Sequence, residues 1–182
     1  MQQMLLGTSG RITYATWNPA DKSTNVVLSN GNLTFAISTA TNSMARSTIS
    51  KSSGKWYWEV TAATTPRIGI ATSAASLNVA LGSEASSWAW YGAVGTIINN
   101  NTTLATVTTL TTGDIIGFAL DVGTGTLSFY KNNVFAYTAT GIPTGMFAAI
   151  SASGATSGGT AKFGATTLTY TPPSGFNAGL YV

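Results

Sequence analysis

The stretch GDIIGFALDVGTGTLSFYKNN, residues 113–133, decides the fold. Ile116, Phe118 and Leu120 alternate with smaller residues, so an extended chain places them on one face. The GTG at residues 123–125 then reverses the chain into a second alternating run, TLSFY. The two asparagines that follow tolerate positive φ and can close another tight turn. Short alternating runs joined by tight turns indicate antiparallel β-hairpins.

The same pattern recurs earlier in the chain. An Asn-Gly pair at positions 30–31 separates two apolar runs, which is the strongest short signal for a hairpin. In KWYWEV, residues 55–60, the two tryptophans and Val60 share one face, and Tyr57 and Glu59 share the other. We find no apolar stripe of helical period and no repeat of about 20–50 residues. The sequence therefore predicts a single all-β domain, either a sandwich or a barrel.

Weaker segments complete the predicted architecture. We expect strands at residues 146–151, 161–164 and 167–170, and two prolines end the last of them because proline cannot donate to a sheet. Residues 73–82 are expected to form a helical turn or a long loop. Residues 99–112 are rich in Thr and Asn, and their β-branched content favours an edge strand with a loop.

The composition removes most catalytic chemistry. The chain has 182 residues with 8 Lys and Arg, 5 Asp and Glu, no His and no Cys. The absence of His and Cys excludes a Ser-His-Asp triad, a cysteine nucleophile and the usual zinc ligands. Glu59, Glu84, Asp114 and Asp121 lie in four separate segments, whereas a glycosidase needs two carboxylates beside one bond. Asp114 and Asp121 also stand where they can cap turns. We expect no enzyme activity, no metal and no cofactor.

The sequence also lacks the features expected of a protein that binds nucleic acids or inserts into membranes. The eight basic residues are scattered and form no stripe of the kind that phosphate binding needs. The apolar start of the chain, residues 1–7, lacks a basic flank and is too short for a signal peptide. No apolar run approaches the roughly twenty residues of a membrane span. We expect no nucleic-acid binding, no membrane insertion and no export by the ordinary secretory signal.

Five segments of the chain, taken in order, resemble the SPRY family. They are GKWYWEV (54–60), RIGI (67–70), LG followed by SWAWY (81–91), GDIIGFALD (113–121) and GTLSFYKN (125–132). The resemblance extends over residues 13–173. It implies a bent β-sandwich of two antiparallel sheets in the concanavalin-like jelly-roll group. It also implies a non-enzymatic binding module whose contacts fall mostly to loops at one end of the sandwich.

One further segment narrows the resemblance. TWNPADK, residues 16–22, together with the hairpin after it, resembles SPRY domains of bacteriophage and bacterial proteins. The sparse charge and the richness in Thr, Ser, Asn, Gly and Ala also resemble phage tail and capsid appendages. These likenesses imply a structural protein of the virion surface, either a tail or capsid appendage or a decoration subunit. Its partners would be other virion subunits in a homo-oligomer, together with a host-surface glycan or protein. The alternative is an intracellular bacterial adaptor that binds a peptide or protein through its end loops.

Candidate binding residues lie near the predicted loops. Arg67 lies on the outer face of its strand and is either a solvated cation or a contact anchor. Trp56, Trp58 and Trp88 are assigned to the core, whereas for Trp90 and Tyr91 a core position and an exposed position both stay open. The candidate binding residues are Arg67, Trp90, Tyr91, Asn99, Asn100 and Asn101.

The two ends of the chain are expected to lie outside the sandwich. The apolar cluster near the start would be unfavourable if exposed alone, so we expect it to dock on another chain. The candidate anchoring residues are Met1, Met4, Leu5 and Leu6. We divide the chain into an N-terminal anchoring segment (1–12), the SPRY-like sandwich (13–173) and a C-terminal tail (174–182).

Overall fold

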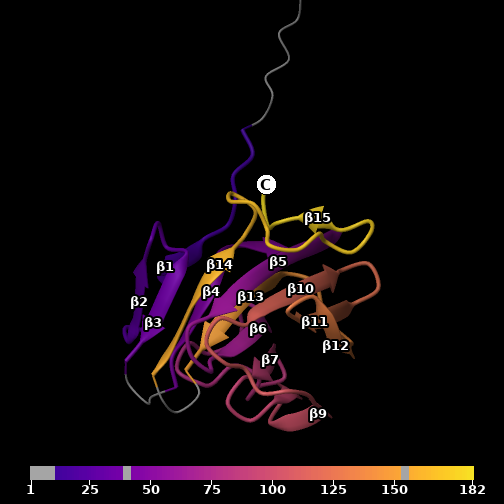
Figure 1. The fold of residues 1–182 in the computed structure, drawn as a ribbon. Helices are drawn as coiled ribbons and strands as arrows, with labels where there is room; N and C mark the ends of the chain where they lie inside the picture. Colours follow the sequence, from indigo (N-terminus) through magenta and orange to yellow (C-terminus); the bar gives the residue numbers. More distant parts are fainter. Residues whose placement is uncertain (1–10, 39–41, 153–155) are drawn as a thin grey trace, which may run out of the picture.

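A computed structural model of the chain describes residues 11–38, 42–152 and 156–182, and these residues form strands and loops without a helix. The strands are β1 (Trp17–Lys22), β2 (Val26–Ser29), β3 (Thr34–Ile37), β4 (Met44–Lys51), β5 (Lys55–Ala62), β6 (Arg67–Ala71), β7 (Ser87–Tyr91), β8 (Thr96–Asn99), β9 (Thr102–Thr106), β10 (Ile115–Asp121), β11 (Thr126–Lys131), β12 (Val134–Thr140), β13 (Met146–Ser151), β14 (Ser157–Lys162) and β15 (Asn177–Ala178). They form two stacked sheets (Figure 1). The prediction of an all-β sandwich is confirmed.

The order of the strands shows how the two sheets are closed on one side. The seven-stranded sheet runs β1-β4-β13-β6-β7-β8-β9, and the eight-stranded sheet runs β12-β11-β10-β5-β14-β3-β2, with β15 pairing parallel to β5. Where β1 meets the turn between β2 and β3, the backbone amide of Trp17 donates to the carbonyl of Asn32 at 2.9 Å, and its indole Nε1 donates to the carbonyl of Leu33 at 3.1 Å. On the other side, β9 and β12 are the outer strands of their sheets.

Aromatic side chains from neighbouring strands fill the core. The register places Phe118 of β10 opposite Trp58 on one flank and opposite Phe129 on the other. The Trp58 and Phe118 rings stack with centroids 5.3 Å apart and an interplanar angle of 13°. Burying each such ring stabilises the fold by roughly 1.5–3 kcal/mol. The predicted alternation in β5 is confirmed, because Trp58 and Val60 are in the core and Tyr57 and Glu59 share the opposite face.

Asparagines form the tight turns of the predicted hairpins. Asn30 and Gly31 have φ of 52° and 61°, and Asn132 and Asn133 have φ of 49° and 66°. Asn132 and Asn133 form the two-residue loop between Lys131 and Val134, as in the primed turns that join twisted antiparallel strands. Asn30 and Gly31, together with Asn32, lie in the four-residue loop between β2 and β3. Asn and Gly reach positive φ at the lowest cost. Both hairpin predictions are confirmed by the pairing of β2 with β3 and of β11 with β12.

Two of the expected late strands differ from the structure. Residues 167–170 form a loop, because the backbone amides of Thr169 and Tyr170 donate to the buried carboxylate of Glu59, at 2.7 and 2.8 Å, and not to a neighbouring strand. β14 starts four residues before the strand expected at 161–164. Residues 73–82 form a looped segment of turns. The expected edge strand within 99–112 is confirmed as β9.

The C-terminal residues are part of the sandwich, so the separate tail expected at 174–182 is wrong. Leu180 is buried in the core, and its carbonyl accepts from the amide of Ala15 at 2.8 Å. The buried ammonium of Lys51 donates to the carbonyl of Tyr181 and lies 3.4 Å from the ring centroid of Trp56. These bonds tie the end of the chain to β4 and to Ala15, just before β1. The anchoring residues Met1, Met4, Leu5 and Leu6 lie outside the described residues.

Candidate binding surfaces

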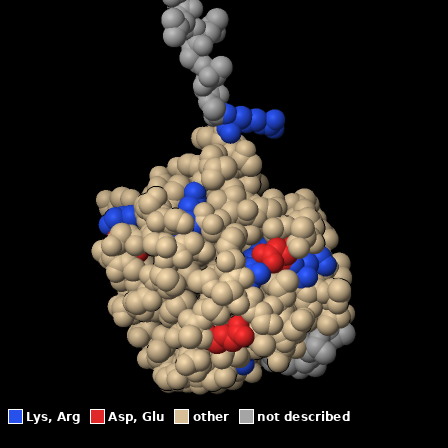
Figure 2. Space-filling view, turned by 180° about the vertical axis from the view of Figure 1, so that it is seen from behind, with Lys and Arg blue, Asp and Glu red and all other residues tan. Residues whose placement is uncertain are grey.

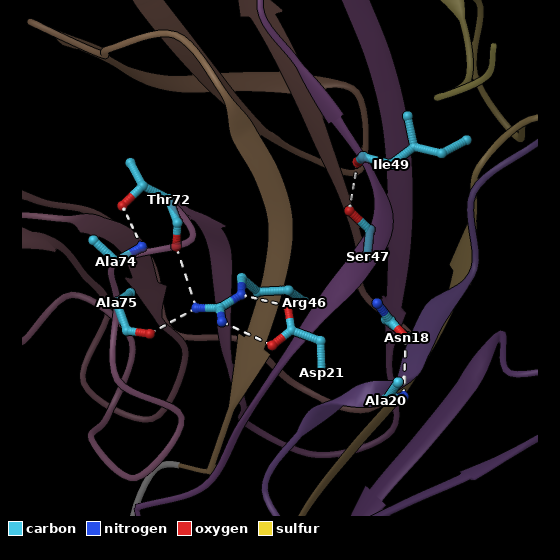
Figure 3. Close-up of polar contacts among 9 residues, drawn as sticks. All are labelled: Asn18, Ala20, Asp21, Arg46, Ser47, Ile49, Thr72, Ala74 and Ala75. Atoms are coloured by element: carbon cyan, nitrogen blue, oxygen red, sulfur yellow. Dashed lines mark hydrogen bonds and ion pairs between the residues drawn. The ribbon is translucent and has the colours of Figure 1, made fainter.

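A loop of residues 72–86 covers the outer face of the seven-stranded sheet, and the buried Arg46 of β4 holds it there. Arg46 is 5% exposed and forms a two-pronged ion pair with Asp21 of β1, with Nε to Oδ2 at 2.7 Å and Nη2 to Oδ1 at 2.8 Å. Its Nη1 donates to the carbonyls of Ala75 at 2.6 Å and Thr72 at 3.2 Å (Figure 3). One guanidinium therefore joins β1, β4 and the loop. Because Asp21 lies 25 residues before Arg46, no local sequence pattern indicated this pairing.

Arg67, a predicted binding residue, fastens the same loop at its other end. Its Nη1 donates to the carbonyl of Leu81 at 3.1 Å and lies 3.4 Å from the hydroxyl of Ser83. The guanidinium carbon stands 3.9 Å from the ring centroid of Tyr91, which is directly opposite Arg67 in the pairing of β6 with β7. Both side chains are half-buried. Arg67 and Tyr91 therefore form a stacked cation–aromatic pair at the surface. The strand pattern predicted the outward direction of Arg67 but not this pairing.

Trp90 is a core residue, so its prediction as a binding residue is wrong. It is 0% exposed, and its indole Nε1 donates to the carbonyl of Thr108 at 3.1 Å. Alternation along β7 explains the result: Trp88 and Trp90 point into the sandwich, and Tyr91 points outward. The assignment of Trp88 to the core is confirmed, while Trp56 is only partly buried at its margin.

The predicted asparagines have structural roles at the opposite end of β7. The side-chain amide of Asn99 donates to the carbonyls of Ser87 at 2.8 Å and Ala85 at 3.3 Å, which fixes the end of the covering loop. Asn100 and Asn101 have φ of 50° and 57° and form the exposed turn between β8 and β9. Asn99 pairs with Trp88 and Arg67 with Tyr91, so the two groups lie three residues apart along β7, roughly 10 Å. The structure does not bring them into one site.

A surface that sequence reasoning missed lies between the outer strands β9 and β12. A groove of about 460 Å³, here called the β9–β12 groove, is lined by Val107, Thr108, Lys131, Val134, Phe135 and Ala136 among others. Val134 is 68% exposed and Phe135 58% exposed, and Leu104 of β9 is a third large apolar side chain open to solvent. The signal available in the sequence was the uncharged run VFAYTAT after the Asn-Asn turn, which we interpreted only as a strand.

The charged groups beside this groove neutralise each other. Lys131 Nζ lies 2.9 Å from Asp114 Oδ2, and Asp114 also accepts from the amide and hydroxyl of Thr111 and from the side chain of Asn132. Burial alone would raise the pKa of the Asp114 carboxyl, but these hydrogen bonds outweigh it and lower the pKa to about 2. Asp121 likewise accepts from two turn amides and pairs with a lysine. The predicted turn-capping roles of Asp114 and Asp121 are confirmed.

The fold and these surfaces define a β-sandwich domain whose candidate sites are formed by loops and sheet edges. Within the ranges that the structure describes, no three His, Cys, Asp or Glu side chains gather where they could hold a metal ion, and no helix is long and apolar enough to cross a membrane. The family model for the SPRY domain matches residues 55–166, which is more than half of the chain. The chain belongs to the SPRY domain family, as the sequence motifs predicted, and SPRY domains are typically non-catalytic modules that bind proteins.

Solved structures show the same fold. The SPRY domain of human HERC1 matches with a TM-score of 0.70 and 16% identity, covering 80% of this chain and 95% of that one. The PSpry domain of TRIM65 matches with a TM-score of 0.69 and 16% identity, covering 82% and 92%. Stonustoxin matches with a TM-score of 0.68 and 21% identity, covering 82% of this chain and 27% of that one. At this identity the likeness extends to the fold alone.

Proposed function

We propose that this SPRY domain is a non-enzymatic structural subunit of a bacteriophage particle, in a tail or capsid appendage or as a decoration protein. In that position its contacts are with other subunits, and its exposed loops face the host surface. The observation that supports the proposal is the near absence of unpaired charge on the surface of the sandwich.

The structure leaves even fewer free charges than the composition suggests. Three ion pairs join six of the thirteen charged side chains. Glu59 and Lys51 are buried. The five that remain in contact with solvent are Arg11, Lys22, Arg67, Glu84 and Lys162. Figure 2 shows one face of the molecule with small, isolated charged spots on an otherwise uncharged surface.

A surface of this kind favours association. Net charge and interspersed Lys and Glu keep a freely diffusing domain apart from its neighbours, and a surface without them offers little electrostatic resistance to packing against a flat polar partner. Such a surface is unfavourable for an isolated domain and suitable for a subunit that is covered in its assembly. Because few lysines are exposed, few long side chains lose conformational freedom when a partner binds.

The proposal is tested by asking where the chain resides. Quantitative mass spectrometry of particles purified from a culture that produces the chain should find it at a fixed ratio to the major shell protein. Recovery only in the particle-free supernatant or in the cell extract would contradict the proposal. A glycan array then distinguishes a subunit that adheres to the host from a purely structural one. Binding to host lipopolysaccharide supports adhesion, and the absence of binding favours the purely structural role.

The Arg67–Tyr91 pair favours a second candidate, an intracellular bacterial adaptor that binds a peptide or protein. The pair stands at the end of β6 and β7 beside the loops, and no carboxylate is paired with Arg67 among the described residues. A guanidinium stacked on an aromatic ring at the surface is suited to bind a carboxylate or a backbone carbonyl of a partner. A bacterial protein retained by the wild-type chain and lost with Arg67→Ala, but retained by Lys22→Ala, would support this role.

A further inference from the structure

The two sides of the sandwich differ in how they end. On the side of β1 and β2, the backbone and indole of Trp17 bridge the two sheets. On the side of β9 and β12, the β9–β12 groove separates the two outer strands, and Val134 and Phe135 are more than half exposed beside it. Large apolar side chains gathered at one open edge mark a surface that is covered in the functional state of a protein.

Irregular strand pairing shows how a partner could bind there. In β9, Ile97 pairs with Ala105 and Ile98 with Thr103, which leaves Leu104 as an extra residue. In β12, Phe129 pairs with Tyr137 and Tyr130 with Phe135, which likewise leaves Ala136 as an extra residue. Bulges of this kind bend an edge strand and block the addition of another strand to the sheet. A partner at this edge is therefore held by apolar side chains in the groove and not by extension of either sheet.

The electrostatics of the groove select an uncharged occupant. Its only lysine, Lys131, is already paired with Asp114 at 2.9 Å and donates to the carbonyl of Thr109 at 2.8 Å. The other lining side chains carry no charge: they are apolar or threonine, except Asn132, whose side chain is bonded to Asp114 and to the amide of Ile115. An anionic or cationic peptide would find no free opposite charge here, whereas an uncharged apolar segment would lose little on leaving water.

We propose that the β9–β12 groove binds residues 1–6 of a second copy of this chain. The segment MQQMLL has four apolar residues, and no side chain in residues 1–10 is charged. Methionine and leucine are flexible enough to fill an irregular apolar groove. An extended chain of six residues spans roughly 20 Å, about the length of the seven-residue outer strand β12.

The position of the first described residues favours a second copy over the chain's own groove. The amide of Thr13 donates to the carbonyl of Val182 at 2.9 Å, which fixes the point where the chain enters the sandwich. Figure 1 shows this entry beside the C-terminus and β15, with β9 at the opposite end of the molecule. Because this entry point and the groove lie on different parts of the surface, a contact between two copies is head-to-tail and generates a ring or an open row of subunits. The inference rests on the proposed function only in treating residues 1–6 as an assembly anchor.

The first test is the oligomeric state of the full-length chain by sedimentation velocity across a range of concentrations. The wild-type chain should assemble, and both Phe135→Asn and a deletion of residues 1–6 should weaken assembly by about 10-fold or more, because each removes apolar burial from the contact. Val134→Asn provides a second groove variant, and Val27→Asn on the opposite edge strand is the matched control that should assemble like the wild type. Unchanged thermal unfolding of each variant shows that the fold is intact.

Mixing identifies the occupant. The deletion variant keeps the groove and Phe135→Asn keeps the segment, so the two, each monomeric alone, should form a one-to-one complex that grows no further. A chain with Leu5→Cys and one with Val134→Cys should cross-link in the mixture, and the absence of native cysteine makes the product unambiguous. Assembly that persists without residues 1–6, a groove variant that assembles normally, or a wild-type chain that stays monomeric would each overturn the inference. If the deletion abolished incorporation into particles but left self-association unchanged, this inference would fail while the proposed function stood.

Discussion

Replacing Arg46 with Met tests whether one guanidinium holds the covering loop to the sandwich. The substitution removes the two hydrogen bonds to Asp21, at 2.7 and 2.8 Å, and the two to the carbonyls of Ala75 and Thr72. Breaking a buried ion pair by removing one partner costs about 3–5 kcal/mol. The Asp21 side chain keeps 29% exposure, so water can partly solvate the carboxylate that is left. We therefore expect a loss of about 3 kcal/mol in the free energy of unfolding.

Urea denaturation followed by tryptophan fluorescence measures this loss. For a chain of this size, about 3 kcal/mol corresponds to a fall in Tm of roughly 6–12 °C. Lys22→Met is the matched control: it removes one positive charge from the strand that carries Asp21, and its ammonium has only a 3.4 Å contact with the carbonyl of Ser23, so we expect a change within about 0.5 kcal/mol. Hydrogen exchange should show faster exchange of amides in residues 72–86 with Arg46→Met. A loss no larger than that of Lys22→Met, with unchanged loop protection, would show that Arg46 does not hold the loop.

Three further predictions concern single contacts. The pKa of Asp114 is about 2 in the folded chain against 3.8 for the free group, so the ionised carboxylate stabilises the fold by about 2 kcal/mol above pH 4, and this is lost as the pH falls toward 2. Asp114→Asn should therefore be destabilised by that amount at pH 7 and have the stability of the wild type below pH 2. A stability difference that is constant with pH would contradict this. A Cβ on Gly117 would clash with the hydroxyl of Tyr57, so Gly117→Ala should lower the free energy of unfolding by about 1–3 kcal/mol. The loss should be smaller in a Tyr57→Phe background, and equal losses in both backgrounds would argue against the clash. Asn133→Ala should cost about 1–2 kcal/mol in denaturant titrations because φ is 66°, whereas Asn133→Gly should be close to neutral; equal effects of the two would show that the backbone angle is not the cause.

The parts of the fold that could be predicted are those encoded by neighbouring residues. Alternation placed Trp58 and Phe118 on the core faces of their strands, and the Asn-Gly pair at 30–31 and the Asn-Asn pair at 132–133 marked turns. Such signals act over a few residues, because side-chain direction and positive φ depend on the local backbone.

The parts that could not be predicted depend on residues distant in sequence. Thr169 and Tyr170 have a β-prone sequence, yet their backbone amides donate to the carboxylate of Glu59, which lies 110 and 111 residues earlier. Leu180 joins the core only because the end of the chain is hydrogen-bonded to Thr13 and Ala15, where the chain enters the sandwich. For the candidate sites, strand alternation gave the outward direction of Arg67. The same alternation puts Trp90 on the core face of β7, but the sequence left open which face of that strand is covered. The β9–β12 groove exists only where the two sheets end together.

The most direct test of the proposed role is a density map of purified particles from a culture that produces this chain. The sandwich should be found in a tail or capsid appendage, in repeated copies packed against other subunits. Particles in which every density is assigned to other chains, with this chain recovered intact in the particle-free fraction, would contradict it.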